Sequence, residues 1–517
     1  MGRVLTNNVS LSYSIETSLG VAGTTWFLIE PNEISTFGAV VTTVAREPIS
    51  KNRQRRKGTV TDLDSSVEYD EDLTMSSFRH FIEGFCFATG INSDMTDLAA
   101  TACETTGDSY TGMTAFSSDQ ADKLEVDTLL WVTGGATAAN NGLKSVDADI
   151  ASSGTAITVT ENLVDETASF NISLAGHRMA ALDAPTWTWD SPATDQATLA
   201  LTGIGTELQA LGVIAGMTLH IGSIAAAGDT TVTNAFENSV ADDMFGYCRV
   251  VSFPDADSVV FDKVDAALQF TDAAISTAVD ILFGEFIRNV AVDDAAYLER
   301  SFQFEAEFPN LGAGATDEFQ YALGNFCNSV TFELPLTDKA TCSFGFIGTD
   351  TENPVASGSR KTGASAASNP LHTAAFNTTS DIARLRITDT DETGLTTDFK
   401  SISLTLSNNV SPEKIIGTLG AAYMNTGNFE TELEAQLLFT NGDVVDRIRA
   451  NTTVTMDFVI KNDDGVISVD FPSMDLGAGD REFPVNESVL INTTGMSFQD
   501  ATLDTSIGIS IFPVPLP

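Results

Sequence analysis

The residues able to do chemistry in this chain are few and scattered. Its four histidines stand apart, at His80, His177, His220 and His372. No HExxH or GxSxG motif and no neighbouring Cys/His pair accompanies them, so we find no nucleophile paired with a base. The acidic runs that begin at Asp389 and Asp463 suggest calcium loops, but turns explain both better, because neither has the full spacing of oxygen ligands. The sequence therefore predicts no catalytic residue, no metal site and no cofactor.

The strongest local feature is a basic loop at residues 46–57. It holds six of the 26 Lys and Arg residues, namely Arg46, Lys51, Arg53, Arg55, Arg56 and Lys57. Basic clusters of this size commonly bind nucleic acid or act as targeting signals, and a simply solvated loop is a further alternative. Because the whole chain has a net charge of −45, we favour a loop that docks onto acidic patches of another copy of the chain.

Charge and composition limit the function classes. The 71 acidic residues argue against a protein that wraps or reads DNA, but not against one that lets DNA slide past. An apolar content of 43% supports buried cores, and 517 residues predict two to four domains. The five cysteines have no metal-binding spacing, which favours buried free thiols and assembly in a reducing compartment. We find neither a membrane-spanning run nor a signal-peptide pattern.

A strand and a helix must position the basic loop. Residues 58–69 alternate apolar and polar side chains, as in a strand. An apolar stripe at helical spacing follows, and it consists of Phe78, Phe81, Ile82 and Phe85. Such a stripe could be a binding surface, but packing of the helix on the sheet is the commoner role, and it is the one we predict.

The same order of elements recurs near the C-terminus. Residues 399–406 alternate, a loop containing Lys414 follows, and residues 417–430 parallel the strand at 58–69. Apolar residues between Leu433 and Ile448 then suggest a helix, and a DDG turn ending at Gly465 joins two further strands. One β-sandwich with a short helix is therefore expected twice, with residues 381–517 as the second copy.

The first sandwich is expected to be split by an insertion. Residues 1–95 and 284–350 would form the sandwich, and 96–283 the insertion. Within the insertion, weak repeats at about 121–180 and 205–270 suggest two small β-barrels. Two stretches are expected to be linkers because Ser, Thr and Gly dominate them, at 93–120 and 351–380. The predicted fold class is thus mainly β: two tandem β-sandwiches, each with a short α-helix, plus the inserted barrels.

The order of these motifs resembles that of the major tail tube proteins of long-tailed, non-contractile bacteriophages. The residues that carry the resemblance lie at 29–33, 53–61, 81–85, 286–289, 298–302, 328–332, 343–348 and 417–419. No single motif is specific, but their order extends over most of the chain. The barrel pair resembles an insertion that many of these proteins carry, although its size and the strong acidity depart from the family pattern.

The resemblance implies a structural protein. Its sandwiches would join into a closed ring, and rings would stack into a hollow tube through which DNA leaves without specific binding. Loop 46–57 would contact the next ring. A duplicated sandwich implies three chains per ring, with six chains still open. The implied partners are further copies and other tail proteins (tape measure, terminator, distal tail), in a virion tail assembled in the host cytoplasm. An acidic secreted or cell-surface adhesin or carbohydrate-binding β-protein is the alternative.

Overall fold

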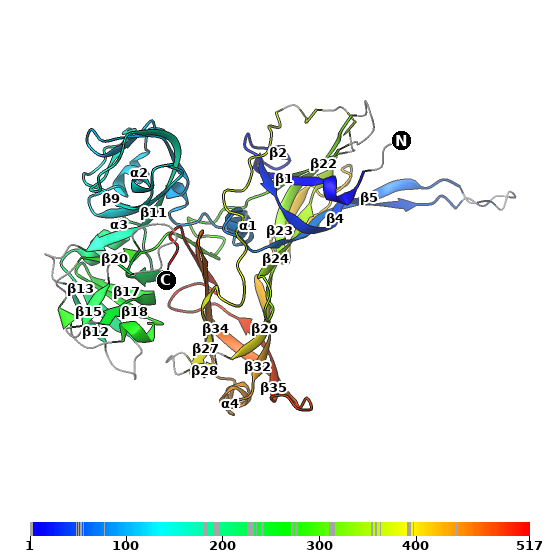
Figure 1. Ribbon diagram of the computed structural model, residues 1–517. Helices are drawn as coiled ribbons and strands as arrows, with labels where there is room; N and C mark the ends of the chain where they lie inside the picture. Colours follow the sequence, from blue (N-terminus) through cyan, green and yellow to red (C-terminus); the bar gives the residue numbers. More distant parts are fainter. Residues whose placement is uncertain are drawn as a thin grey trace.

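The fold described here is that of a computed structural model. It describes residues 4–47, 49, 51, 54, 56–76, 78–179, 185–189, 196–224, 232–233, 235–238, 242–269, 273–274, 278–309, 316–352, 355–356, 359–361, 363–389, 394–396, 398–440 and 442–516. The protein is mainly β, with large antiparallel sheets, which confirms the predicted fold class. Figure 1 shows a projecting hairpin, two stacked β units and a laterally attached pair of smaller modules.

The first unit is assembled from two separated stretches of chain. The first stretch contains the 3-10 turn η1 (Thr6–Asn8), β1 (Ser10–Ser18), β2 (Val21–Ala22), β3 (Phe27–Ile29), β4 (Pro31–Val44), β5 (Thr59–Asp72) and α1 (Phe78–Phe85). The second contains β22 (Phe302–Phe308), β23 (Glu318–Leu334), β24 (Thr341–Gly348), β25 (Asp350–Thr351) and β26 (Val355–Ala356). The first half of β23 pairs with β22, and its second half pairs with β24. β23 therefore passes from one sheet of the sandwich into the other.

The second unit is continuous in sequence. Its elements are β27 (Ile382–Asp389), β28 (Gly394–Thr396), β29 (Phe399–Ser407), β30 (Ser411–Glu413), β31 (Tyr423–Asn425), β32 (Glu430–Leu438), α4 (Asp443–Ala450), β33 (Val454–Asn462), β34 (Gly465–Glu482), β35 (Leu490–Ser497) and β36 (Gly508–Phe512). Strand β34 corresponds to β23 of the first unit, because its first half pairs with β33 and its second half with β35.

The two units repeat the same strand pairings. β4–β5, β5–β24, β23–β24, β22–β23 and β1–β22 in the first unit correspond to β29–β32, β32–β35, β34–β35, β33–β34 and β27–β33 in the second. The helices also correspond, because α1 follows β5 and α4 follows β32. The correspondence assigns to each position of one unit a counterpart in the other.

The insertion consists of two modules between α1 and β22. The first contains β6 (Leu98–Glu104), β7 (Ser109–Thr111), α2 (Ser118–Asp122), β8 (Thr128–Thr133), β9 (Gly142–Ser145), β10 (Ile157–Thr158) and β11 (Glu166–Met179). The second contains β12 (Thr186–Trp189), β13 (Ala197–Ala200), α3 (Ile204–Ala210), β14 (Thr218–Ile221), β15 (Phe236–Asn238), β16 (Asp242–Met244), β17 (Gly246–Asp255), β18 (Ser258–Asp262), β19 (Ala273–Ala274) and β20 (Val279–Leu282). Strand β21 (Glu285–Arg288) then returns the chain to the second unit by pairing with β36.

These strands extend the modules beyond the expected ranges of 121–180 and 205–270. β6 and β7 lie inside the stretch that its Ser and Thr content suggested to be a linker, yet they pair with β11 and β10. β6 (LAATACE) and β7 (SYT) consist mainly of small residues, which occur in strands as well as loops, so the composition of the whole stretch could not separate the two. Ser117 also starts α2 with a capping box to Gln120.

The second unit corrects two sequence predictions. The helix expected between Leu433 and Ile448 is strand β32 followed by the short helix α4. Leu433 and Leu437 are four residues apart, a spacing that fits both a helix and alternate positions of a strand, and the buried Ala435 between them fixes the period as two. The strand expected at 417–430 is instead a turn, in which Gly417 has a φ of +98°, followed by β31.

One hydrophobic core runs through both units. Helix α1 contributes Phe78, Phe81, Ile82 and Phe85 to it, and all four are buried. The ring of Phe81 lies 5.1 Å from that of Phe302 on β22 and 5.2 Å from that of Phe346 on β24. Because β22 and β24 belong to opposite sheets, Phe81 fills the space between them.

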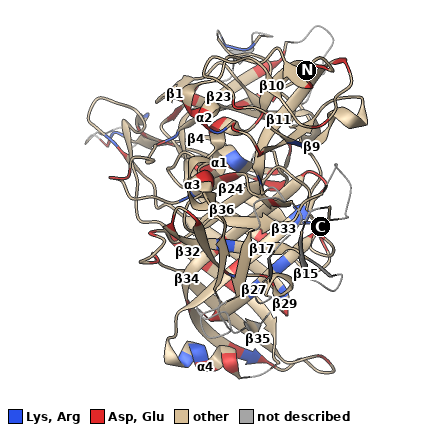
Figure 2. Ribbon diagram, turned by 90° about the vertical axis from the view of Figure 1, so that its left-hand side faces the viewer, with Lys and Arg blue, Asp and Glu red and all other residues tan. Residues whose placement is uncertain are grey.

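A buried charge cluster attaches the second module to the second unit. Lys263, 1% exposed, follows β18 and contacts Asp470 and Asp457 of the second unit. Arg249 of β17 pairs with Asp470 at 2.7 Å. Arg384, on β27 of the second unit, pairs with Asp265 of the second module at 3.0 Å. In Figure 2 several of the few basic residues lie around β17, β27 and β33.

The same cluster sets the charge state of Asp457. Burial opposes its ionisation, but Arg384, Lys263 and Arg386 outweigh burial and hold the pKa of Asp457 well below its usual range. A carboxyl with a lowered folded pKa stabilises the fold above its unfolded pKa, and this contribution is lost as the pH falls through the folded value.

Asp457→Asn tests the cluster. Removing one partner of a buried ion network leaves cations uncompensated, so the free energy of unfolding should fall by about 3–5 kcal/mol at pH 7. The difference from the unmodified chain should shrink below about pH 4. Urea unfolding followed at pH 7 and pH 3 measures both effects. Glu487→Gln, at a side chain that is 61% exposed, is the control; an equal loss in both variants would contradict a special role for Asp457.

Candidate assembly surfaces

The two units are fused into one antiparallel sheet. Its strand order is β4–β5–β24–β23–β29–β32–β35–β34, where β23 and β34 take part with their second halves. The central joint pairs β23 with β29, from Ser329 opposite Ser407 to Leu334 opposite Ile402. We call this pairing the β23–β29 joint.

Both outer edges of this sheet are unpaired among the described residues. β4 pairs with β5 alone, and the second half of β34 pairs with β35 alone. In the unit correspondence, β4 is the counterpart of β29 and β34 that of β23. The two free edges are therefore the same kinds of edge that the β23–β29 joint brings together. Val40 and Val44 of β4 are 69% and 58% exposed, which is unusual for an edge that stays in solvent.

One face of the sheet is solvent-facing and acidic. Side chains alternate along each strand, and the outward-facing positions of β5 and its counterpart β32, which are exposed or half-buried, carry Asp62, Asp64, Glu68, Asp70, Asp72, Glu430, Glu432 and Glu434. The corresponding positions of the strands between them are mostly hydroxyl residues, namely Ser329, Thr331, Ser343, Ser401, Ser403 and Thr405. This face repels phosphates and offers them no cationic row to bind.

The basic loop lies at the end of the hairpin formed by β4 and β5, which projects from the first unit in Figure 1. Of the six basic residues, Arg46, Lys51, Arg56 and Lys57 are exposed, whereas Arg53 and Arg55 lie outside the described residues. Ile49 between them is fully exposed.

The counterpart loop of the second unit folds back onto the first unit. The Lys414 ammonium contacts Asp62 and Asp64 of β5, both at 2.6 Å, and this hydrogen bond lowers the pKa of Asp62. The Ala421 amide donates to the Thr349 carbonyl at 3.2 Å. At the base of the loop, Val410 is buried against Phe87 and Phe326. A loop at this position therefore serves, within the chain, to hold the neighbouring unit.

A comparison with known families decides the class of protein. Residues 258–501 match the family model of the phage tail tube protein. This stretch, just under half of the chain, is that of a phage tail tube protein. The match begins in β18, crosses β22–β24 of the first unit and ends after β35 of the second. It confirms the family to which the order of the sequence motifs pointed. No curated protein matches the chain.

The family gives the chain a structural role in the tail of a virion. Among the described residues, no group of three or more His, Cys, Asp or Glu is arranged to hold a metal ion. None of the helices in the described ranges is long and apolar enough to cross a membrane. All five cysteines are buried free thiols, as expected for Cys86, Cys327 and Cys342.

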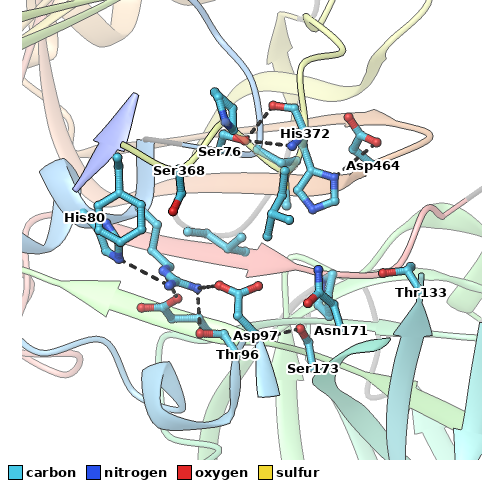
Figure 3. A pocket seen from close by; sticks show the side chains of 18 of the residues that line it. Ser76, His80, Thr96, Asp97, Thr133, Asn171, Ser173, Ser368, His372 and Asp464 are labelled. Carbon is cyan, nitrogen blue, oxygen red and sulfur yellow. Dashed lines mark hydrogen bonds and ion pairs between the residues drawn. The ribbon is translucent and has the colours of Figure 1, made fainter. Parts of the chain in front are cut away.

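Like many proteins, this tail tube protein also has an internal pocket. It measures about 360 Å³ and lies where α1, the first module and residues 368–372 meet. Figure 3 shows His372 and Asp464 on one side of it and Thr96, Asp97 and Ser173 on the other. Most of its polar groups are paired with each other: Arg79 donates to Thr96 at 2.6 Å and pairs with Asp97 at 3.2 Å.

Ser76, His372 and Asp464 bring the residue types of a hydrolase triad into this pocket. The His372 ring lies 3.3 Å from Asp464. The Ser76 hydroxyl, however, donates to the His372 carbonyl at 2.6 Å and accepts from its amide, instead of contacting the imidazole. His80 is no better as a base, since burial together with Arg79 and Arg300 lowers its pKa to about 3.

Glu285 is the one strongly perturbed carboxyl at the edge of the pocket. It is 1% exposed, and its side chain lies 3.4 Å from Arg79. Burial raises its pKa to about 8, and the carboxylates of Glu83 and Asp97 add to a rise that Arg79 and Arg300 oppose. Arg79 and Glu285 were not predicted from sequence, because they lie 206 positions apart (285 − 79) and no local pattern connects them.

Glu285→Gln tests this assignment. A folded carboxyl with a raised pKa binds a proton that the unfolded chain releases, so the unmodified protein loses stability as the pH rises from about 5 to 8. Glutamine mimics the protonated acid. The free energy of unfolding of the variant, relative to that of the unmodified protein, should therefore rise by up to about 1.4 kcal/mol per pH unit across that interval. Urea unfolding between pH 5 and 9 measures it, with the exposed Glu299→Gln as control. A gap that does not depend on pH would contradict the raised pKa.

Proposed function

We propose that this chain is the subunit of a phage tail tube in which three chains close a ring and rings stack into a conduit for DNA. The observation that carries the proposal is the β23–β29 joint together with the two matching free edges. If β34 of one chain pairs with β4 of the next as β23 pairs with β29, each chain adds eight strands to a continuous barrel. A head-to-tail contact of this kind closes into a ring.

The number of chains follows from the unit correspondence. Residues 1–95 with 284–350, and residues 381–517, act in this proposal as two copies of one tube unit, so three chains supply six units. The acidic face would then line the lumen, where it keeps DNA mobile because it offers no counter-charge. At the tube ends the loops between rings would meet the other tail proteins, with the tape measure inside.

The edges are tested by hydrogen exchange. In assembled tubes, the amides of β4 at 37–41 and of β34 at 477–482 that point away from β5 and β35 should exchange more slowly than in the isolated chain, because they gain a strand partner. Residues 329–334 of the β23–β29 joint, already paired, should exchange alike in both states and are the internal control. Unchanged exchange at both edges in formed tubes would refute this ring.

Removing the positive charge of the basic loop tests its role in assembly. The proposal assigns it to contact between rings, and the acidic surface of a second copy fits it by charge complementarity. Deleting residues 46–57, or changing its six basic residues to Gln, should abolish tubes in negative-stain microscopy and leave folded rings or monomers. Changing the four arginines to Lys preserves the charge and is the matched control. Normal tubes from the Gln variant would contradict docking by charge.

A further inference from the structure

The segment that leads into the second unit is bound to the first unit at one backbone site. The Phe376 amide donates to the Leu73 carbonyl at 3.0 Å, and the Phe376 carbonyl accepts from the Ala340 amide at 2.8 Å. The Phe376 side chain is fully buried in the shared core. Phe376 thus bridges the end of β5 and the turn between β23 and β24.

Neighbouring residues extend this contact along the same turn. Asn377 forms an antiparallel bridge with Lys339. The Thr378 amide donates to the Asp338 carbonyl at 2.9 Å, and its hydroxyl donates to the Pro335 carbonyl at 2.5 Å. A short extended segment is therefore added to the turn in the manner of a strand.

The second unit has the same site. In the first unit the Leu73 amide donates to the Ala340 carbonyl at 3.0 Å, and in the second the Phe439 amide donates to the Val489 carbonyl at 2.9 Å. The counterparts of the groups that Phe376 binds are therefore the Phe439 carbonyl and the Val489 amide. Neither has a hydrogen-bond partner in the part of the chain that the structure describes.

Apolar side chains border this second site. Phe483 and Val485 of the turn between β34 and β35 are 75% and 86% exposed. Phe439 itself is only partly buried against the core. We call the Phe439 carbonyl, the Val489 amide and these side chains the second-unit slot.

The counterpart of Asn377 in the chain is Val4. In the strand register, Ser12 and Arg386 face the equivalent residues Glu305 and Asp457, and β27 has one extra residue at position 383. Ile382 therefore corresponds to Val9, and Asn377 to Val4, whereas the counterpart of Phe376 lies outside the described residues. A turn separates residue and strand in both cases, at 378–380 and at Thr6–Asn8. Val4 and Leu5 are 40% and 43% exposed, and the Leu5 backbone is extended.

We infer that the second-unit slot binds Val4 and Leu5 of a neighbouring copy of this chain. The inference rests on the proposed ring. When β4 of the next chain pairs with β34, β1 of that next chain takes the position next to the β34–β35 turn that β27 has next to the β23–β24 turn. The residues entering β1 then cross the slot. In Figure 1 the N-terminus and the β34–β35 hairpin lie at opposite ends of the molecule, so the chain does not fill its own slot.

A cysteine pair tests the contact. Asn377 and Lys339 face each other in the first unit, and their counterparts are Val4 and Ser488. Residues paired across antiparallel strands have Cα atoms about 4.5–5.5 Å apart, which a disulfide spans. Val4→Cys/Ser488→Cys should, in assembled material under mild oxidation, give a ladder of linked chains that ends at three on a non-reducing denaturing gel. The five native cysteines are buried and do not contribute.

Three controls make the result decisive. Each single variant should stay monomeric on the gel, and Lys339→Cys/Asn377→Cys should close within one chain and show that the bridge geometry permits a disulfide. Val489→Pro removes the free amide and also restricts the backbone at Ser488 and Val489. It should raise the concentration needed for ring formation about fivefold, and an unchanged circular dichroism spectrum would show that the fold is retained. Normal tubes from the Val4/Ser488 pair without linked chains would overturn the inference and leave the proposed ring intact; absence of rings from the unmodified chain would overturn both.

Discussion

The β23–β29 joint is the contact on which the rest of the structure depends. Six residue pairs, from Ser329–Ser407 to Leu334–Ile402, merge the sheets of two units that share one hydrophobic core. Because the joint fixes the two units in a head-to-tail order, it also fixes which edges stay open. An open edge invites unspecific pairing. Here the two open edges are complements of each other, which in the proposed ring would direct their pairing to further copies.

The two units agree on the inner side of the sandwich and differ on the outer side. In the first unit, buried Glu305 is covered by the linking segment, through Arg360 at 2.7 Å. In the second, Asp457 occupies the corresponding central position of β33 and is covered by Lys263 of the inserted module. Both solutions pair a buried carboxylate with cations, as burial of charge demands. The insertion is thus held by the chemistry that elsewhere holds a simple segment of chain.

The sequence predicted the fold class, the tail tube family, the strand after the basic loop and the burial of Phe78, Phe81, Ile82 and Phe85, because all depend on local periodicity or on motif order. It failed where two periods coincide, as at Leu433 and Leu437, and where short strands lie in a stretch rich in small residues, as β6 and β7 do. The joint, the free edges and the pairing of Arg79 with Glu285 depend on contacts between residues far apart in sequence. Local patterns carry no information on such contacts, and only the fold brought them to light.

The covalent fusion of the two units lowers the number of molecules that must meet to assemble a ring. In the proposed ring, every second lateral contact is the β23–β29 joint, which forms during folding and at an effective concentration that free subunits in solution do not reach. Ring closure then requires the encounter of three molecules instead of six, so its rate falls far less steeply on dilution. In that ring, a fused subunit would therefore let tubes nucleate at protein concentrations at which six separate units would rarely meet.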